Sequence, residues 1–141
     1  TWARGAVTDY SYAPAGELAL VDYADATTPD VAYTYDRLGR ITQVTDGSGA
    51  RTFSYEPQSD RIATLTHALA DGRTLVSHTA VEANRGLIDY VSHAVKTPGQ
   101  PDVLVSEYDY ANNAIGQRTG VNRTGTATTP SSIAKYLQAH V

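Results

Sequence analysis

Aromatic or aliphatic residues alternate with small polar residues along most of the chain, and short turn signals interrupt this alternation. The clearest stretch covers residues 33–47. Tyr33 and Tyr35 lie two positions apart, so they project from one face of a strand. Residues 36–39 are a predicted turn, because Asp bonds the backbone that follows it and Gly accepts a positive φ. Residues 40–45 then form the returning strand of a β-hairpin.

The same order of parts recurs along the chain, as in a repeat protein. Val76-Ser77-His78 fits the position of an aromatic pair, and the turn over residues 56–60 is one residue longer and lacks glycine. We predict an all-β meander of consecutive antiparallel hairpins with ten to twelve strands. The residues that fix this repeat are the aromatic pairs and the turn residues: Tyr10, Tyr12, Gly16, Tyr33, Tyr35, Asp36, Gly39, Arg40, Phe53, Tyr55, Tyr108, Tyr110 and Gly116.

The sequence also predicts the turns and loops that connect the strands. Residues 70–73 are a further hairpin turn, and residues 97–101 are a surface loop whose prolines cannot serve a central strand. Residues 122–130 are polar and predict a loop, and residues 131–141 show the only helical pattern, a short C-terminal helix. We therefore expect one segment over residues 1–141, with hairpin repeats over about 7–121 and the loop and helix over 122–141.

Composition agrees with a β-rich chain and excludes several classes of protein. The sequence has 10 Tyr, which favours strands, and 41% hydrophobic and 18% charged residues. No apolar run approaches the ~20 residues of a membrane span, so we expect none. The net charge of −4 argues against nucleic-acid binding. Cys and Met are both absent, which excludes disulfides and leads us to expect a segment of a longer chain.

The tyrosines allow two interpretations. Their faces are suited to stacking on sugars, which would make the sheet a carbohydrate-binding platform. Alternatively they pack across strands, where each aromatic pair contributes roughly 0.2–1 kcal/mol. We favour packing, because the repeat places them at fixed strand positions. Tyr23 and Tyr90 lie outside the aromatic pairs, and we expect these two to be the more exposed tyrosines.

Charged residues near the turns also allow two interpretations. Arg40, Arg61 and Arg118 follow turns, whereas Asp36 and Asp109 precede turns or lie within them. Alternating charges of this kind would suit a binding groove. We favour a structural role, in which Asp caps the turn and Arg covers a neighbouring strand and stacks on Tyr.

Candidate catalytic and metal-binding groups are sparse. The four histidines lack the close spacing of a zinc pair. Asp22, Asp25 and Asp30 lie close together, but a calcium loop also needs a distal bidentate Glu, so we favour a solvated loop. The sequence has neither a Gly-x-Ser-x-Gly elbow nor a phosphate-binding loop. We predict no catalytic residue, no metal and no cofactor, and therefore a protein that is not an enzyme.

The run from Tyr33 to Ile41, Tyr-Thr-Tyr-Asp-Arg-Leu-Gly-Arg-Ile, resembles the tyrosine-aspartate (YD) repeats of the rearrangement-hotspot (Rhs) family. Residues 11–18 and 108–118 are looser matches to the same repeat. The resemblance implies that the hairpins form a curved strip of a larger YD-repeat β-shell. Shells of this kind enclose a C-terminal toxin in bacterial members, and related barrels occur in animal adhesion proteins.

The resemblance also implies a function and partners. We expect a structural segment of a shell that encapsulates a toxin or other cargo in a large exported or cell-surface bacterial protein. Its partners would be the remaining repeats of the parent chain and the encapsulated domain, with no nucleic acid and no membrane. The alternative is an adhesion module that binds a carbohydrate or a cell-surface protein. No Asp-Pro pair occurs, so the self-cleaving end of such shells is expected outside this segment.

Overall fold

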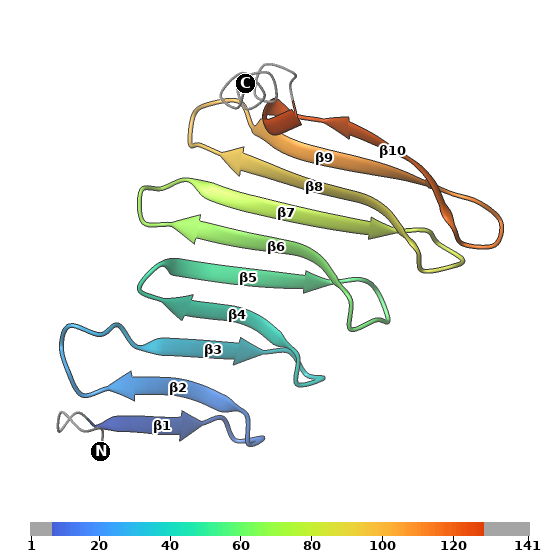
Figure 1. Ribbon diagram of the computed structural model, residues 1–141. Helices are drawn as coiled ribbons and strands as arrows, with labels where there is room; N and C mark the ends of the chain where they lie inside the picture. The colour runs from blue at the N-terminus through green and yellow to red at the C-terminus, as the bar shows by residue number, and fades with distance from the viewer. Residues whose placement is uncertain (1–6, 129–141) are drawn as a thin grey trace, which may run out of the picture. The chain divides into compact units, whose positions relative to one another are not determined.

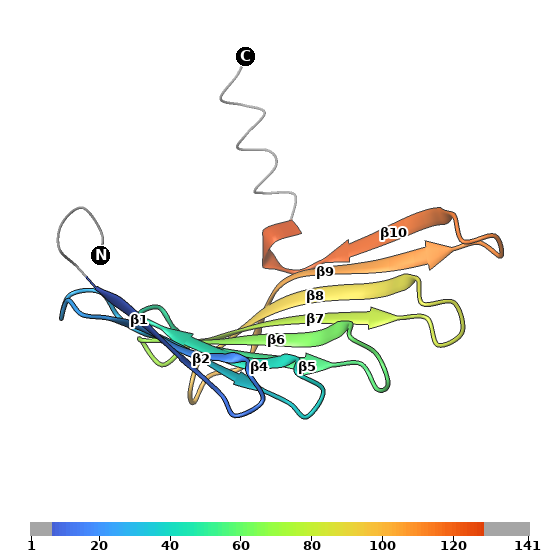
Figure 2. The same cartoon turned by 90° about the horizontal axis from the view of Figure 1, so that it is seen from below.

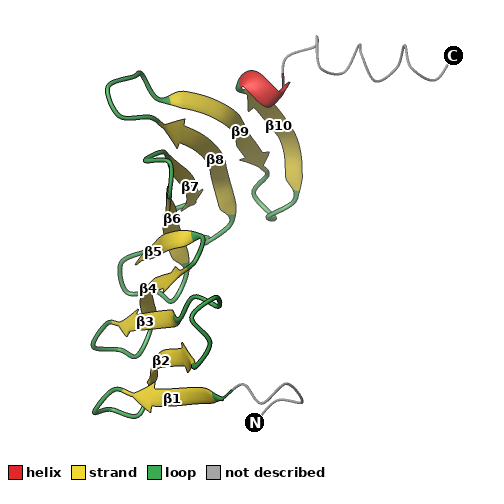
Figure 3. Cartoon of the chain, turned by 90° about the vertical axis from the view of Figure 1, so that its left-hand side faces the viewer, coloured by secondary structure: helices red, strands yellow, loops and turns green. Residues whose placement is uncertain are grey.

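The computed structural model describes residues 7–128 of the 141-residue chain. Within these residues the secondary structure is ten strands and a single 3-10 turn (Figures 1 and 3). The helix expected over residues 131–141 lies outside the described residues. The elements are β1 Thr8–Tyr12, β2 Leu18–Tyr23, β3 Val31–Tyr35, β4 Ile41–Asp46, β5 Gly49–Tyr55, β6 Ile62–Leu69, β7 Thr74–Val81, β8 Ile88–Lys96, β9 Val103–Asn112, β10 Arg118–Thr124 and η1 Thr126–Thr128.

The chain divides into two compact units, one that ends at Gly72 and one that begins at Arg73. In the first unit, β1 to β6 pair in chain order, each antiparallel to the next. In the second unit, β7 to β10 do the same. The single segment that we expected therefore comprises two such units. The prediction of an all-β meander of consecutive antiparallel hairpins is confirmed, with a strand count inside the predicted range.

The two faces of the first unit differ in the size of their side chains. Cross-strand partners share a face, and Tyr10, Val21 and Val31 are partners along β1, β2 and β3. Ser11, Leu20 and Ala32 form the row on the opposite face, where Leu20 is the one large side chain of the three. This difference follows from the period-2 alternation in the sequence, which sends neighbouring residues to opposite faces.

Each unit is a single layer of strands, as the edge-on view shows (Figure 2). Val21 is the only buried hydrophobic side chain among the described residues, and it is still 8% exposed. No described side chain is fully enclosed, that is, less than 2% exposed. A sheet without a second layer has no enclosed core. Its stability must therefore come from the contacts between neighbouring strands and from the turns that join them.

The last strand is longer than the sequence suggested. The polar stretch 122–130 was expected to be a loop, but β10 continues as far as Thr124. Asn122, Arg123 and Thr124 have paired partners on β9, at Asp109, Tyr108 and Glu107 respectively. Pairing with a long neighbouring strand thus overrides the weak strand propensity of this polar sequence.

Candidate functional site

The hairpin turns share one pattern of backbone hydrogen bonds. In the turn after β3, the Asp36 amide donates to the Arg40 carbonyl over 2.9 Å, and the Gly39 amide donates to the Asp36 carbonyl over 3.1 Å. Gly39 has a φ of 77°, in the left-handed region that glycine adopts without strain. The same two bonds form in the turns after β1 and β9, which begin at Ala13 and Asn113.

Two of the turns are longer by one residue. After β5 the Glu56 amide donates to the Arg61 carbonyl over 2.9 Å, and after β7 the Glu82 amide donates to the Leu87 carbonyl over 2.9 Å. The first of these turns has no glycine, as the sequence indicated, and Gln58 takes the positive φ, 58°, instead. The turn after β5 therefore keeps the hydrogen-bond pattern of the repeat, but Gln58 is held in a strained backbone conformation.

An Asp or Asn side chain caps two of the turns from its first position. Asp36 Oδ1 accepts hydrogen bonds from the amides of Leu38 at 2.8 Å and Arg40 at 3.0 Å. Asn113 Oδ1 accepts from the amides of Ile115 at 3.2 Å and Gln117 at 2.9 Å. Desolvation acts to raise the pKa of Asp36, but the hydrogen bonds from Arg40 and Leu38 outweigh it and lower that pKa below its ordinary value.

Each hairpin has two residues that recur at fixed places beside its turn. We call the last residue of the first strand the slot residue and the first residue of the second strand the exit residue. The two are paired across every hairpin, next to a shift in register that marks a β-bulge. The slot and exit residues are Tyr12 and Leu18, Tyr35 and Ile41, Tyr55 and Ile62, Val81 and Ile88, and Asn112 and Arg118.

The slot residues connect neighbouring hairpins. The Tyr35 hydroxyl donates to the carbonyl of Leu18, the exit residue of the preceding hairpin, over 2.8 Å. The Tyr55 hydroxyl donates to the carbonyl of Ile41, again the preceding exit residue, over 2.7 Å. In the second unit Asn112 Nδ2 makes the equivalent bond to the Ile88 carbonyl over 3.3 Å. The second tyrosine of an aromatic pair is therefore a hydrogen-bonded link between hairpins.

Arg40 adds a second link between hairpins. Its Nη2 lies 2.7 Å from Asp36 Oδ2 in its own turn. Its guanidinium lies over the ring of Tyr55 at 4.2 Å, and Nη1 donates to the Ser59 carbonyl in the next hairpin. This agrees with the structural interpretation of the arginines, in which the side chain covers a neighbouring strand and stacks on Tyr.

The other two arginines differ from Arg40. Arg118 stacks on a tyrosine within its own hairpin, with its guanidinium 3.6 Å from the ring centroid of Tyr110. Arg61 is exposed, and its amide donates to Ser59 Oγ over 3.1 Å. Arg40 and Arg118 thus stack on tyrosine in different ways, Arg40 on the next hairpin and Arg118 within its own, and Arg123 lies over the ring of Tyr108 at 5.8 Å.

In two hairpins, the residues that occupy the aromatic-pair position in the structure differ from those assigned from the sequence. The turn that starts at Asn113 places Tyr110 and Asn112 where Tyr33 and Tyr35 stand in the clearest repeat. Asp109, which was expected near a turn, lies within β9 opposite Tyr90. The turn residues rather than the aromatic pair set the position of the repeat, because β9 is longer than β3.

The same correction applies to β7. Val76-Ser77-His78 was assigned to the aromatic-pair position, but the strand continues to Val81 before its turn begins at Glu82. Thr79 and Val81 occupy the position instead. His78 therefore faces the side of the sheet opposite to that of the slot residue.

Exposure of the tyrosines also differs from the expectation. Tyr23 and Tyr90 were expected to be the exposed ones, but both are half-buried. Of the tyrosines within residues 7–128, the exposed ones are Tyr10 and Tyr12, at 57% and 63%. Both lie on β1, which among the described residues pairs with β2 alone, so their rings have neighbours on one side only.

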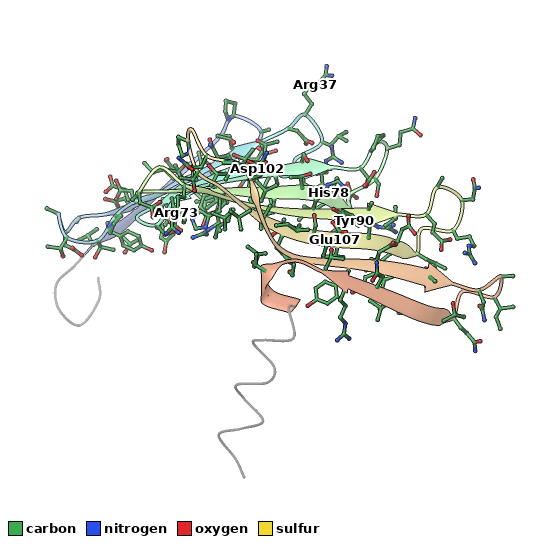
Figure 4. All side chains as sticks on the ribbon, turned by 90° about the horizontal axis from the view of Figure 1, so that it is seen from above. Arg37, Arg73, His78, Tyr90, Asp102 and Glu107 are labelled. Carbon is green, nitrogen blue, oxygen red and sulfur yellow. The ribbon has the colours of Figure 1, made fainter. Side chains whose placement is uncertain are left out.

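A polar cluster on strands β7 to β10 was not found from the sequence. Tyr90 Oη donates to Glu107 Oε2 over 3.1 Å, and Thr124 Oγ1 donates to Glu107 Oε1 over 3.2 Å. The ring of His78 lies 5.8 Å from that of Tyr90 (Figure 4). Only the strand register brings these residues together, and the sequence spacing carries no signal for it. The contacts link four strands, β7 to β10.

The acidic loop between β2 and β3 has a structural arrangement. Asp25 Oδ1 accepts from the amides of Thr27 at 3.0 Å and Thr28 at 2.8 Å, and Asp30 Oδ1 accepts from the Tyr23 amide at 3.0 Å. Over residues 7–128, no group of three His, Asp or Glu side chains is placed to hold a metal ion. Nor does that part of the chain contain a helix of the length and apolarity needed to cross a bilayer.

Comparison with known families identifies the repeat. Residues 14–52 and 35–74, two overlapping stretches, match the model of the family described as RHS Repeat. No curated protein matches the sequence. The matched region, somewhat less than half of the chain, contains the turn at Asp36 and both tyrosine links between hairpins. Residues 14–74 of the chain therefore contain RHS repeats, of the tyrosine-aspartate type that its clearest hairpin resembles.

Proposed function

We propose that the chain is a non-enzymatic wall segment of an RHS shell, and that this shell encloses a toxin or other cargo domain. The observation that carries the proposal is the link between hairpins, in which Tyr35 and Tyr55 each bond the exit carbonyl of the hairpin before. A wall must be continuous from one hairpin to the next, and this bond repeats at each such junction within the first unit. A single layer of sheet suits a wall better than it suits a compact globule.

The charged side chains support a role without catalysis. Asp36 caps a turn, and Asp46 accepts a hydrogen bond from Arg51 Nη2 over 2.7 Å in the turn after β4. Glu82 Oε2 accepts from Arg85 Nε over 2.6 Å, and Glu82 Oε1 accepts from Asn112 Nδ2 over 2.9 Å. Carboxylates engaged in this way stabilise turns and strand pairs, and they are not arranged around a common point where a substrate would react.

The proposal includes partners and a location. The wall would continue into further RHS repeats of the parent chain, and its inner face would meet the enclosed domain. By family resemblance the parent would be a bacterial protein that is exported or held at the cell surface.

Proteolysis of the parent protein tests the wall. Tyr35→Phe and Tyr55→Phe together remove both links in the first unit, whereas Tyr33→Phe removes a hydroxyl that makes no hydrogen bond with the described residues. We expect the enclosed domain to be cleaved several-fold faster by an added protease in the double variant than in Tyr33→Phe. Equal cleavage rates, or a parent without any protease-protected domain, would contradict the proposal.

Binding to a surface ligand is the second candidate function, and one observation favours it. Tyr10 and Tyr12 expose more than half of their surface on the first strand of the sheet. Aromatic faces of this kind stack on the apolar faces of sugars. A glycan array followed by titration of intrinsic fluorescence decides between the two functions. Saturable binding that Tyr10→Ala abolishes would establish the adhesion role, and the wall proposal expects no saturable response.

A further inference from the structure

One end of the second unit, where β7 and β9 begin and β8 ends, has three large apolar side chains in line. Leu75 pairs with Val95 across β7 and β8, and Val95 pairs with Val103 across β8 and β9. Cross-strand partners share a face of the sheet, so these three side chains lie side by side on one face. We call them the apolar row.

The apolar row is more exposed than the side chains behind it. Leu75 is 39% exposed and Val103 is 46% exposed. On the opposite face at the same end, Val76, Ala94 and Leu104 form the corresponding row, and all three are half-buried. Large apolar side chains that lie together and exposed mark a surface suited to contact with another element. The face of the apolar row is therefore the one that a further layer would cover.

The chain beyond β10 is directed to the β9 end of this row. A Cβ on Gly125, which follows β10, would lie 2.6 Å from the Val105 carbonyl oxygen, so the chain passes in close contact with β9. Thr126 Oγ1 then donates to the Leu104 carbonyl over 3.3 Å, and η1 lies beside the start of β9 (Figure 1). Leu104 directly follows Val103. The described residues thus end beside the member of the apolar row that β9 contributes.

The sequence that follows η1 has the length and the pattern to cover this row. The helical pattern over residues 131–141 places its large apolar residues on one side: Ile133, Tyr136, Leu137 and Val141. A helix over these residues would be about 16 Å long. Three neighbouring strands span about 10 Å. A helix that starts beside β9 is therefore long enough to reach β7.

We propose that residues 131–141 form a helix that packs its apolar side onto the apolar row. Over residues 7–128 each unit is a single layer (Figure 2), so this helix adds a second layer over three strands of the second unit. It removes Leu75 and Val103 from solvent and gives this end of the sheet a small core. The proposal concerns contacts within one chain, so it depends neither on what the wall encloses or binds nor on what pairs with β10.

Nuclear Overhauser effects between methyl groups test where the helix lies, in the full chain. We expect contacts from the methyl groups of Ile133 and Leu137 to those of Val95 and Val103. We expect none to those of Val76, which lies on the opposite face of the sheet. Contacts to Val76 in place of the apolar row, or contacts to neither face, would overturn the proposal.

A double-mutant cycle tests whether the contact stabilises the fold. Val103→Ala and Leu137→Ala are made singly and together in the full chain, and urea unfolding is measured. Alanine keeps the helix propensity at position 137. Because residues in contact are coupled, we expect Val103→Ala to raise the unfolding equilibrium constant about 2- to 10-fold less when residue 137 is already alanine.

The matched control replaces Val103→Ala with Val76→Ala in the same cycle. Val76→Ala removes the same two methyl groups from the opposite face, so its effect is expected to be the same with leucine or alanine at position 137. No coupling between Val103 and Leu137, or equal coupling in the two cycles, would overturn the proposal.

Discussion

At the scale of single residues, the two members of an aromatic pair have different roles. Tyr33 and Tyr35 lie on one strand, two positions apart, and both are half-buried. Only Tyr35 bonds a neighbouring hairpin, through its hydroxyl to the Leu18 carbonyl. The first residue contributes packing across strands, and the second also positions the next hairpin. The two tyrosines of a pair look equivalent in the sequence, but they have different structural roles.

Removing one hydroxyl measures the link directly. Tyr35→Phe is expected to lower the free energy of unfolding by about 0.5–1.5 kcal/mol, the usual net contribution of one hydrogen bond. Tyr33→Phe is the matched control and is expected to leave it nearly unchanged. Urea unfolding followed by circular dichroism measures both variants. Equal destabilisation by the two substitutions would show that the Tyr35 hydroxyl does not link the hairpins.

The stability of the first unit is expected to depend on pH through the carboxylate of Asp25. Hydrogen bonds from the hydroxyls of Thr27 and Thr28 lower the pKa of Asp25 from 3.8 to about 2. Because the pKa is lower in the folded state, the contribution to stability is present above about pH 4 and is lost as the pH falls toward 2. We expect a carbon-detected NMR titration of Asp25 to show a midpoint near 2.

Substitution of the two donors supplies the control for this titration. With Thr27→Ala and Thr28→Ala combined, the midpoint of Asp25 should move up toward 3.8, because the two side-chain hydrogen bonds that lower its pKa are lost. A wild-type midpoint near 4 that the substitutions leave in place would mean that these threonines do not hold the carboxylate.

At the scale of the elements, turn chemistry sets where each hairpin begins and ends. Asp36 and Gly39 predicted their turn from sequence, and the structure has it there. Asn113 and Gly116 have the same spacing of capping residue and glycine, but the repeat was assigned from the aromatic pair Tyr108 and Tyr110 instead. An Asn caps a turn as an Asp does, so the spacing of capping residue and glycine is the better guide to the repeat.

Gly49 shows a second constraint at this scale, the close approach of two strands. A Cβ added to Gly49 would lie 2.0 Å from the Ala68 carbonyl oxygen on β6, and φ is +125°. Gly49→Ala is therefore expected to lower the free energy of unfolding by more than the about 1–3 kcal/mol of backbone strain alone. Thermal and urea unfolding of the purified variant would measure this loss.

Gly16→Ala is the comparison that separates strain from collision. Gly16 also has a positive φ, +100°, but a Cβ there would meet nothing within 4 Å. Its substitution is expected to cost only the strain, and so less than that of Gly49. If the two alanine variants unfold with the same free energy, the contact between β5 and β6 at Gly49 is not as close as described.

At the scale of the whole molecule, the sequence predicted the class of fold and the order of strands but not the contacts between hairpins. The alternation around Tyr33, Tyr35 and Val44 indicates strands because side-chain direction has period 2. The bond from Tyr55 to the Ile41 carbonyl depends on how two strands are offset, and no local pattern encodes that offset. The Tyr90 and Glu107 contact was missed for the same reason.

A chain with so little buried side-chain surface depends on repetition. Val21 is the only buried hydrophobic side chain described, and the remaining stability comes from many equivalent interfaces between strands. Repeat proteins gain stability in this way, since each unit is supported by its neighbours. The central claim is therefore that one interface, with one register, joins successive hairpins within each unit.

Nuclear Overhauser effects across the strands test this claim most directly. In the assigned NMR spectrum of the full chain, we predict cross-strand backbone contacts for three pairs, Leu20 with Ala32, Gln43 with Thr52 and Tyr90 with Asp109. All three share the same offsets from the slot and exit residues. Strands that form but show contacts at three different offsets, or none between successive hairpins, would contradict the account.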